Sequence, residues 1–130
     1  MDHKENAWMY VRQRGSDKEL ERQIEWLQEQ AAKQDYTVVG ITATTEDQRR
    51  KALRQLRKAM REQKLDVVMV TRLTNLSHHN HILYRLLCEM QDRGIRLECS
   101  GQQMAYELHL RGLQERLRRR AHRKNGFVPW

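Results

Sequence analysis

The sequence predicts an α/β fold in which a mainly parallel sheet of four to five strands is flanked by helices, followed by a long carboxyl-terminal helix. Short apolar segments alternate with amphipathic helical segments along the chain, and this order is typical of parallel sheets. Residues 65–70 (LDVVMV) are almost continuously apolar, as expected for a strand that is covered on both faces. A chain of 130 residues is long enough for one hydrophobic core.

The first part of the chain predicts two strands around one helix. Residues 7–12 (AWMYVR) and residues 36–42 (YTVVGIT) are rich in aromatic and β-branched side chains, which favours strands. Ser16 and Glu19 have the spacing of a capping box at the start of a helix. Apolar residues then recur at helical spacing on one face: Leu20, Ile24, Leu27 and Ala31.

The middle of the chain repeats this alternation. Thr45 to Gln48 could cap a second helix, whose apolar face is Leu53, Leu56 and Met60. After the strand at residues 65–70, residues 71–80 have no apolar period and predict a loop. A third helical stripe follows and ends near Gly94, before a fourth strand at residues 95–99: Ile82, Leu83, Leu86, Leu87 and Met90.

A further capping box, Ser100 to Gln103, opens the long helix, which we expect to reach about Lys124. Its apolar positions have a heptad-like spacing: Tyr106, Leu110, Leu113 and Leu117. This stripe could pack on the sheet, but a helix about 30 Å long outlasts so small a domain, which favours dimerisation through it. We therefore divide the chain into an α/β domain (1–100), a long basic helix (101–124) and a tail (125–130).

The positive charge of the chain is concentrated in this helix. The net charge is +8, and residues 111–124 alone contain seven cations and one anion. Such a segment is typical of proteins that bind a polyanion, most often nucleic acid, although cations also complement a helix carboxyl terminus. The candidate DNA-binding residues in this segment are Arg116, Arg118, Arg119, Arg120, Arg123 and Lys124.

Several other classes of protein lack support in the sequence. Neither a GxGxxG nor a GxxxxGK motif occurs, and we expect no cofactor. His78, His79 and His81 lie close together, but no cysteine or carboxylate accompanies them at a ligand spacing, so we expect no metal. No apolar run approaches the about 20 residues of a membrane span, and the polar start, MDHKENAW, has no signal-peptide core. Two cysteines make no disulfide framework, so we expect a cytoplasmic protein.

Taken in order, these segments resemble the resolvase/invertase catalytic domain of serine recombinases. Tyr10-Val11-Arg12 and Leu20-Glu21-Arg22-Gln23 resemble the family opening Y-x-R-x-S-T followed by L-x-x-Q. The resemblance covers about residues 7–100 through blocks at residues 36–40, 53–56, 65–70 and 92–97. It implies a parallel-sheet domain that dimerises through its long helix and places the basic end of that helix along the DNA minor groove.

The resemblance carries over only part of the catalytic site. Arg12, Gln23 and Arg50 match family residues, whereas the position of the nucleophilic serine falls on Arg14. The family loop D-R-L-x-R falls on residues 74–78, so that its carboxylate and two arginines are replaced by Thr74, Asn75 and His78. Attack of serine on a phosphate needs the nucleophile and the cations that neutralise the developing charge. The departures therefore predict a catalytically inactive domain, in which Arg12, Arg14 and Arg50 contact DNA.

The leading hypothesis is a DNA-binding, oligomerising and catalytically inactive relative of serine recombinases. Its expected partners are duplex DNA, further copies of the chain as a homodimer or higher oligomer, and an active serine recombinase. The alternative is an active strand-exchange enzyme in which Ser16 replaces the missing serine and acts with Arg12, Arg50 and Gln23, although Ser16 also fits a helix cap. A third reading is a structural dimer whose basic tail meets another protein or RNA.

Overall fold

The computed structural model describes residues 4–99, 112, 115–116 and 118–120. Four parallel strands form one sheet in the order β2-β1-β3-β4. They are β1 (Asn6–Arg12), β2 (Thr37–Thr44), β3 (Val67–Val70) and β4 (Arg96–Cys99). This arrangement confirms the predicted α/β class and the parallel sheet.

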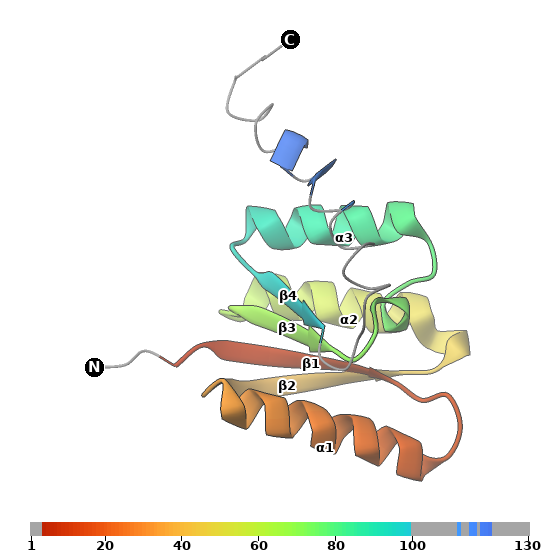
Figure 1. The fold of residues 1–130 in the computed structure, drawn as a ribbon. Coiled ribbons are helices and arrows are strands. Elements are labelled where there is room, and N and C mark those ends of the chain that lie inside the picture. Colours follow the sequence, from red (N-terminus) through yellow and green to blue (C-terminus); the bar gives the residue numbers. More distant parts are fainter. Residues whose placement is uncertain (1–3, 100–111, 113–114, 117, 121–130) are drawn as a thin grey trace.

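Helices cover both faces of the sheet (Figure 1). The helix α1 (Asp17–Lys33) lies on one face, and α2 (Arg49–Glu62) and α3 (Asn80–Asp92) lie on the other. Alternation along β1 divides the core accordingly. Met9 packs toward α1, whereas Trp8 and Tyr10 belong to the larger cluster under α2 and α3.

The predicted boundary of α1 is confirmed by its cap. The Ser16 side chain accepts a hydrogen bond from the Glu19 amide, with 3.4 Å between oxygen and nitrogen. Leu27 and Ala31 of the predicted apolar face are buried, and Leu20 and Ile24 are partly buried against the same core cluster. The sequence pattern therefore gave both the start of this helix and its buried side.

The start of α2 differs from the prediction. Thr45 precedes a short 3-10 turn, η1 (Glu46–Gln48), and its side chain makes no capping hydrogen bond. The α-helix itself begins at Arg49, after Gln48. The sequence has the spacing of a capping box here, but in the structure these residues form the tighter 3-10 turn that connects β2 to α2.

Close packing of β1 on β2 requires one glycine. The register between these strands shifts between Ala7 and Trp8, which brings Trp8 opposite Gly40. A Cβ atom at Gly40 would lie 2.0 Å from the Trp8 ring. The Trp8 indole N–H donates to the Thr42 hydroxyl at 2.9 Å, which fixes the ring over the glycine.

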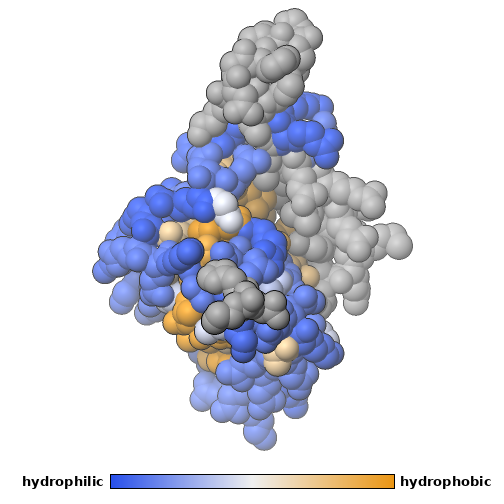
Figure 2. Space-filling view, turned by 90° about the vertical axis from the view of Figure 1, so that its left-hand side faces the viewer, coloured by the Kyte–Doolittle hydropathy of each residue, from blue (hydrophilic) through white to orange (hydrophobic). Residues whose placement is uncertain are grey.

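The described surface is mainly polar. Figure 2 views the molecule from the side at which the strands begin and shows hydrophilic residues interrupted by smaller hydrophobic patches. Among the described residues, the large exposed apolar side chains are Trp26 on α1 and three on the edge strand β2: Val38, Val39 and Ile41. Within that part of the chain, no helix has the length and apolar character needed to cross a bilayer.

A few residues of the segment predicted to form the long helix are described. Residues 112, 115–116 and 118–120 are helical, and they lie beside α3 (Figure 1). Arg120 forms a bidentate ion pair with Asp92, with both distances 3.0 Å. The guanidinium of Arg116 lies 5.7 Å from the centre of the Tyr84 ring. The proposed dimerisation residues lie outside the described residues: Tyr106, Leu110, Leu113 and Leu117.

Candidate functional site

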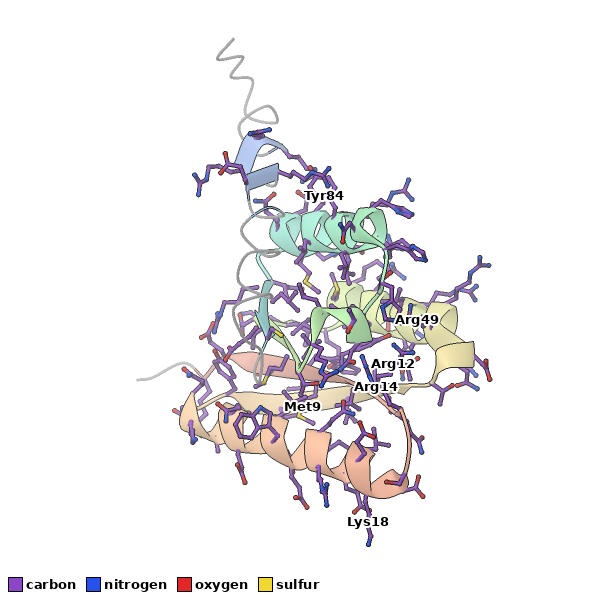
Figure 3. The ribbon with its side chains drawn as sticks, turned by 45° about the vertical axis from the view of Figure 1, so that its right-hand side comes forward. Met9, Arg12, Arg14, Lys18, Arg49 and Tyr84 are labelled. Carbon is purple, nitrogen blue, oxygen red and sulfur yellow. The ribbon has the colours of Figure 1, made fainter. Side chains whose placement is uncertain are left out.

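The candidate site lies at the carboxyl ends of β1 and β3. These strands are neighbours, but the chain leaves β1 for α1 on one face and leaves β3 for α3 on the other. Such a reversal opens a crevice beyond the strand ends, which is where open α/β sheets bind ligands. Figure 3 shows Arg12, Arg14 and Arg49 close together at this end of the sheet.

Arg12 is the last residue of β1 and is only 7% exposed. One of its terminal nitrogens, Nη1, lies 3.2 Å from Nε2 of His78. The Gln23 side chain fixes the backbone of Arg12 by donating to its carbonyl at 2.7 Å and accepting from its amide at 3.3 Å. Gln23, matched to the family glutamine, thus ties α1 to the end of β1.

Arg14 extends across the crevice to the loop after β3. Its Nη2 donates to the Thr74 hydroxyl at 3.2 Å and to Oδ1 of Asn75 at 3.1 Å. Both partners belong to a short turn, η2 (Leu73–Asn75), and Asn75 is buried and donates in turn to the Thr71 hydroxyl at 3.1 Å. The positions matched to the family nucleophile and to its D-R-L-x-R loop are therefore in direct contact in this fold.

The family resemblance matched Arg50 to an active-site arginine, whereas in the structure its neighbour Arg49 contacts the loop of this site. Arg49 begins α2 and donates from Nη2 to the Thr74 carbonyl at 3.4 Å, whereas Arg50 is exposed on the next position of the helix. A usable signal existed: the first turn of α2 is RRK and contains no acidic residue. Cations are unfavourable at a helix amino terminus, so their presence there indicates a role other than helix stability.

The three guanidinium groups repel one another. Burial lowers the pKa of Arg12, and the charges of Arg49 and Arg14 lower it further. Burial likewise lowers the pKa of Arg14, followed by the charge of Arg72. Among the described side chains, no salt bridge joins Arg14 or Arg49 to a carboxylate at 4.0 Å or less. An anion at this position would relieve the repulsion.

The surroundings of His78 favour the neutral form of its ring. The nearby charge of Arg49 is the main cause that lowers the pKa of His78 below its ordinary value, followed by burial and by the charges of Arg12 and Arg14. A neutral ring can accept the hydrogen bond from Arg12 at Nε2.

Two further polar residues near the arginines, Tyr10 and Ser16, have defined surroundings. Tyr10 is fully buried, and burial raises the pKa of its hydroxyl to about 12. It therefore stays neutral beside Arg12 and Arg49. Ser16, the alternative nucleophile, is occupied by the cap of α1 described above.

The predicted DNA-binding cations of the carboxyl-terminal segment lie on a different part of the molecule, beside α3. Arg118 and Arg119 have 79% and 63% of their side chains exposed and lie 3.5 and 3.8 Å from the carboxylate of Glu115. Arg123 and Lys124 lie outside the described residues. Among the described residues, no three histidine, cysteine or acidic side chains are placed to hold a metal ion.

Comparison with solved structures agrees with this fold. The chain superimposes on the carboxyl-terminal catalytic domain of ISC1926 TnpA, an IS607-like serine recombinase, with a TM-score of 0.64 and 26% identity over 72% of this chain and 67% of that chain. It also superimposes on a resolvase family site-specific recombinase from Streptococcus pneumoniae, with a TM-score of 0.68 and 19% identity over 95% of each chain. The second likeness supports the fold alone.

Comparison by sequence identifies the family. No curated protein matches the chain. A family model described as the resolvase N-terminal domain matches residues 7–123, which include both strand ends of the candidate site. The chain therefore belongs to the resolvase N-terminal domain family.

Proposed function

We propose that this resolvase-family domain binds the phosphates of duplex DNA at the carboxyl ends of β1 and β3 and does not cleave them. The observation that carries the proposal is the side chain of Arg14. It stands where the family resemblance places the nucleophile, and it is held by Thr74 and Asn75 at 3.2 and 3.1 Å. A guanidinium in that position can pair with a phosphate but cannot attack it.

The chemistry of the cluster supports binding over cleavage. In-line attack on a phosphate requires a hydroxyl or thiol nucleophile. The position matched to the nucleophile holds Arg14 instead, and its guanidinium donates to Thr74 and Asn75. At the positions matched to a carboxylate and two arginines, the neighbouring loop supplies the Thr74 hydroxyl, the Asn75 amide and the His78 imidazole. Each lost transition-state donor typically costs about 100- to 1000-fold in rate.

A second cationic surface extends this proposed interface. Arg118 and Arg119 are exposed, and with Arg116, Arg123 and Lys124 they would follow the DNA backbone. We also propose that residues 101–124 form a helix that dimerises through Tyr106, Leu110, Leu113 and Leu117. Such a dimer could bridge DNA or occupy the helix interface of an active recombinase.

The experiment that tests this function measures binding and cleavage in the same sample. Fluorescence anisotropy of a labelled duplex should show binding by the wild-type chain, which weakens at least tenfold in the Arg118→Ala/Arg119→Ala/Arg120→Ala variant. Denaturing electrophoresis of the same mixture should show no covalent protein–DNA adduct. An adduct that disappears in Ser16→Ala would instead establish the alternative enzyme, and absence of duplex binding at low salt would overturn the proposal.

A further inference from the structure

Beside the Arg12–Arg49 cluster, a separate pocket opens on the α1 side of the crevice. Its volume is about 300 Å³, at the lower end of the range for small-molecule sites. Its walls come from the turn after β1, the first half of α1 and the loop after β3, with Arg14, Arg22, Arg72 and Trp26 among the lining residues. Four lining residues also take part in the hydrogen bonds of the candidate site: Arg14, Gln23, Thr71 and Asn75.

The charge of the pocket selects an anion. Three guanidinium groups line it, from Arg14, Arg22 and Arg72, against the single carboxylate of Glu19. Burial is the main cause that lowers the pKa of Arg14; the charge of Arg72 lowers it further, and the charge of Glu19 offsets this only in part. Two hydrogen bonds from Arg14 to Thr74 and Asn75 fix one of these cations before any ligand arrives. A dianionic phosphate would be paired here by groups that otherwise repel one another.

The aromatic wall of the pocket selects a flat group beside that phosphate. Trp26 has 42% of its surface exposed, although the remainder of α1's apolar side packs on the sheet. Burial therefore does not account for a tryptophan at this position. An indole beside guanidinium groups is the combination with which proteins hold an unpaired base and its phosphate.

We infer that this pocket binds a nucleoside 5′-phosphate, with the base stacked on Trp26 and the phosphate paired with Arg14 and Arg72. Glu19, Gln23 and Thr71 also line the pocket and offer partners for the sugar hydroxyls and the base edge. Two sources have this chemistry: a free nucleotide and an unpaired nucleotide at a strand end. The inference rests on the proposed function only through Arg14, and it concerns a ligand that a continuous duplex does not present.

Calorimetric titration of the full chain with adenosine 5′-monophosphate, adenosine and inorganic phosphate tests the inference. The nucleotide should bind at least tenfold more tightly than either part alone, because both walls must be engaged. Trp26→Ala should weaken nucleotide binding about tenfold, Trp26→Phe should retain most of it, and Arg72→Ala should reduce it to the level of adenosine. Arg61→Ala, an exposed cation at the far end of α2, is the matched control and should have no effect.

Two duplexes distinguish a free nucleotide from an unpaired nucleotide at a strand end. They also distinguish failure of this inference from failure of the proposed function. A blunt duplex and one with a single unpaired 5′-phosphorylated nucleotide compete for the pocket against adenosine 5′-monophosphate. Competition by the second duplex alone assigns the pocket to strand ends, and competition by neither assigns it to the free nucleotide. Equal affinity for nucleotide and phosphate, or unchanged nucleotide binding in Trp26→Ala, would overturn the inference even if the blunt duplex binds.

Discussion

Arg96 and Arg14 lie at opposite ends of the same parallel sheet, and their guanidinium groups have opposite surroundings. At the end where the strands begin, Arg96 donates to the Glu5 carboxylate and to the Tyr36 hydroxyl at 2.7 Å, and that hydroxyl donates to Glu98 at 2.6 Å. The hydrogen bonds to Glu5 are the main cause that raises the pKa of Arg96. At the end where the strands finish, burial and neighbouring arginines lower the pKa of Arg12 and Arg14.

We interpret this difference as one between an ion pair that stabilises the fold and arginines that bind an external anion, as proposed above. At the first end, the Glu5 carboxylate of the same chain neutralises the charge of Arg96. The arginines at the second end are close to one another and thus store unfavourable electrostatic energy that an external anion would remove. Perturbation by like charges in a crevice is a marker of a functional site.

The largest expected effect comes from rebuilding the family's catalytic pattern at the second end. The variant Arg14→Ser/Thr74→Asp/Asn75→Arg/His78→Arg restores the nucleophile, the carboxylate and both arginines. It should form a covalent adduct with duplex DNA, whereas the wild-type chain and Arg14→Ser alone should form none, because one hydroxyl without its cations cannot stabilise the developing charge. Adduct formation by Arg14→Ser alone would show that the present loop is still catalytic.

Charge reversal at one arginine should have the next largest effect. Arg14→Glu should weaken binding of a blunt duplex roughly 10- to 100-fold, since it replaces a phosphate contact with a repulsion. Arg61→Glu changes the net charge equally at the far end of α2 and should change the affinity less than threefold. Similar losses in both variants, measured by anisotropy, would mean that net charge rather than the cluster binds DNA.

A smaller effect is expected from the paired arginine. Arg96→Ala should lower the free energy of unfolding by about 0.5–1 kcal/mol, because the ion pair with Glu5 is partly exposed. Its affinity for duplex DNA should equal that of the wild type. Chemical denaturation and anisotropy on the same preparation check both parts, and a loss of DNA affinity would remove the distinction between the two ends.

The smallest effect concerns pH. The folded state lowers the pKa of His78, so its contribution to stability is present above the unfolded-state pKa of about 6.5 and is lost as pH falls through the lower, folded-state value. His78→Gln keeps an acceptor for Arg12 but cannot titrate. Its unfolding free energy should therefore fall less between pH 7 and pH 5 than that of the wild type.

His79→Gln, which removes a histidine of the same loop, serves as the control for that comparison. Superimposable pH curves for His78→Gln and the wild type would refute the environment assigned to His78.

Local sequence signals were enough for much of the fold. The apolar run of β3, the apolar stripes of α1 and α3 and the cap at Ser16 each depend on residues close in sequence. The left-handed backbone of Gly94, with φ +70°, follows the end of α3 and was anticipated as its stop signal. The 3-10 turn before α2 was missed because its spacing also fits a capping box.

The site was predictable only where the family resemblance supplied the alignment. It matched Arg12, Arg14, Thr74, Asn75 and His78 to one site. In the structure, hydrogen bonds join Arg12 to His78 and join Arg14 to Thr74 and Asn75. The resemblance matched Arg50 rather than Arg49 to the family arginine. The two side chains point in different directions, because one residue along a helix rotates the side chain by about 100°. The pocket with Trp26 and Arg72 depends on contacts between α1 and a loop that follows about 45 residues later in the chain, which no local pattern encodes.

The most direct test of the central claim is the salt dependence of duplex binding. The logarithm of the association constant of the wild-type chain, plotted against the logarithm of salt concentration, should be linear. In Arg14→Ala the slope should be shallower by about 0.9, the value for one lost phosphate contact, and in Arg61→Ala it should be unchanged. Equal slopes for Arg14→Ala and the wild type would contradict the assignment of the mutually repelling arginines to DNA phosphate.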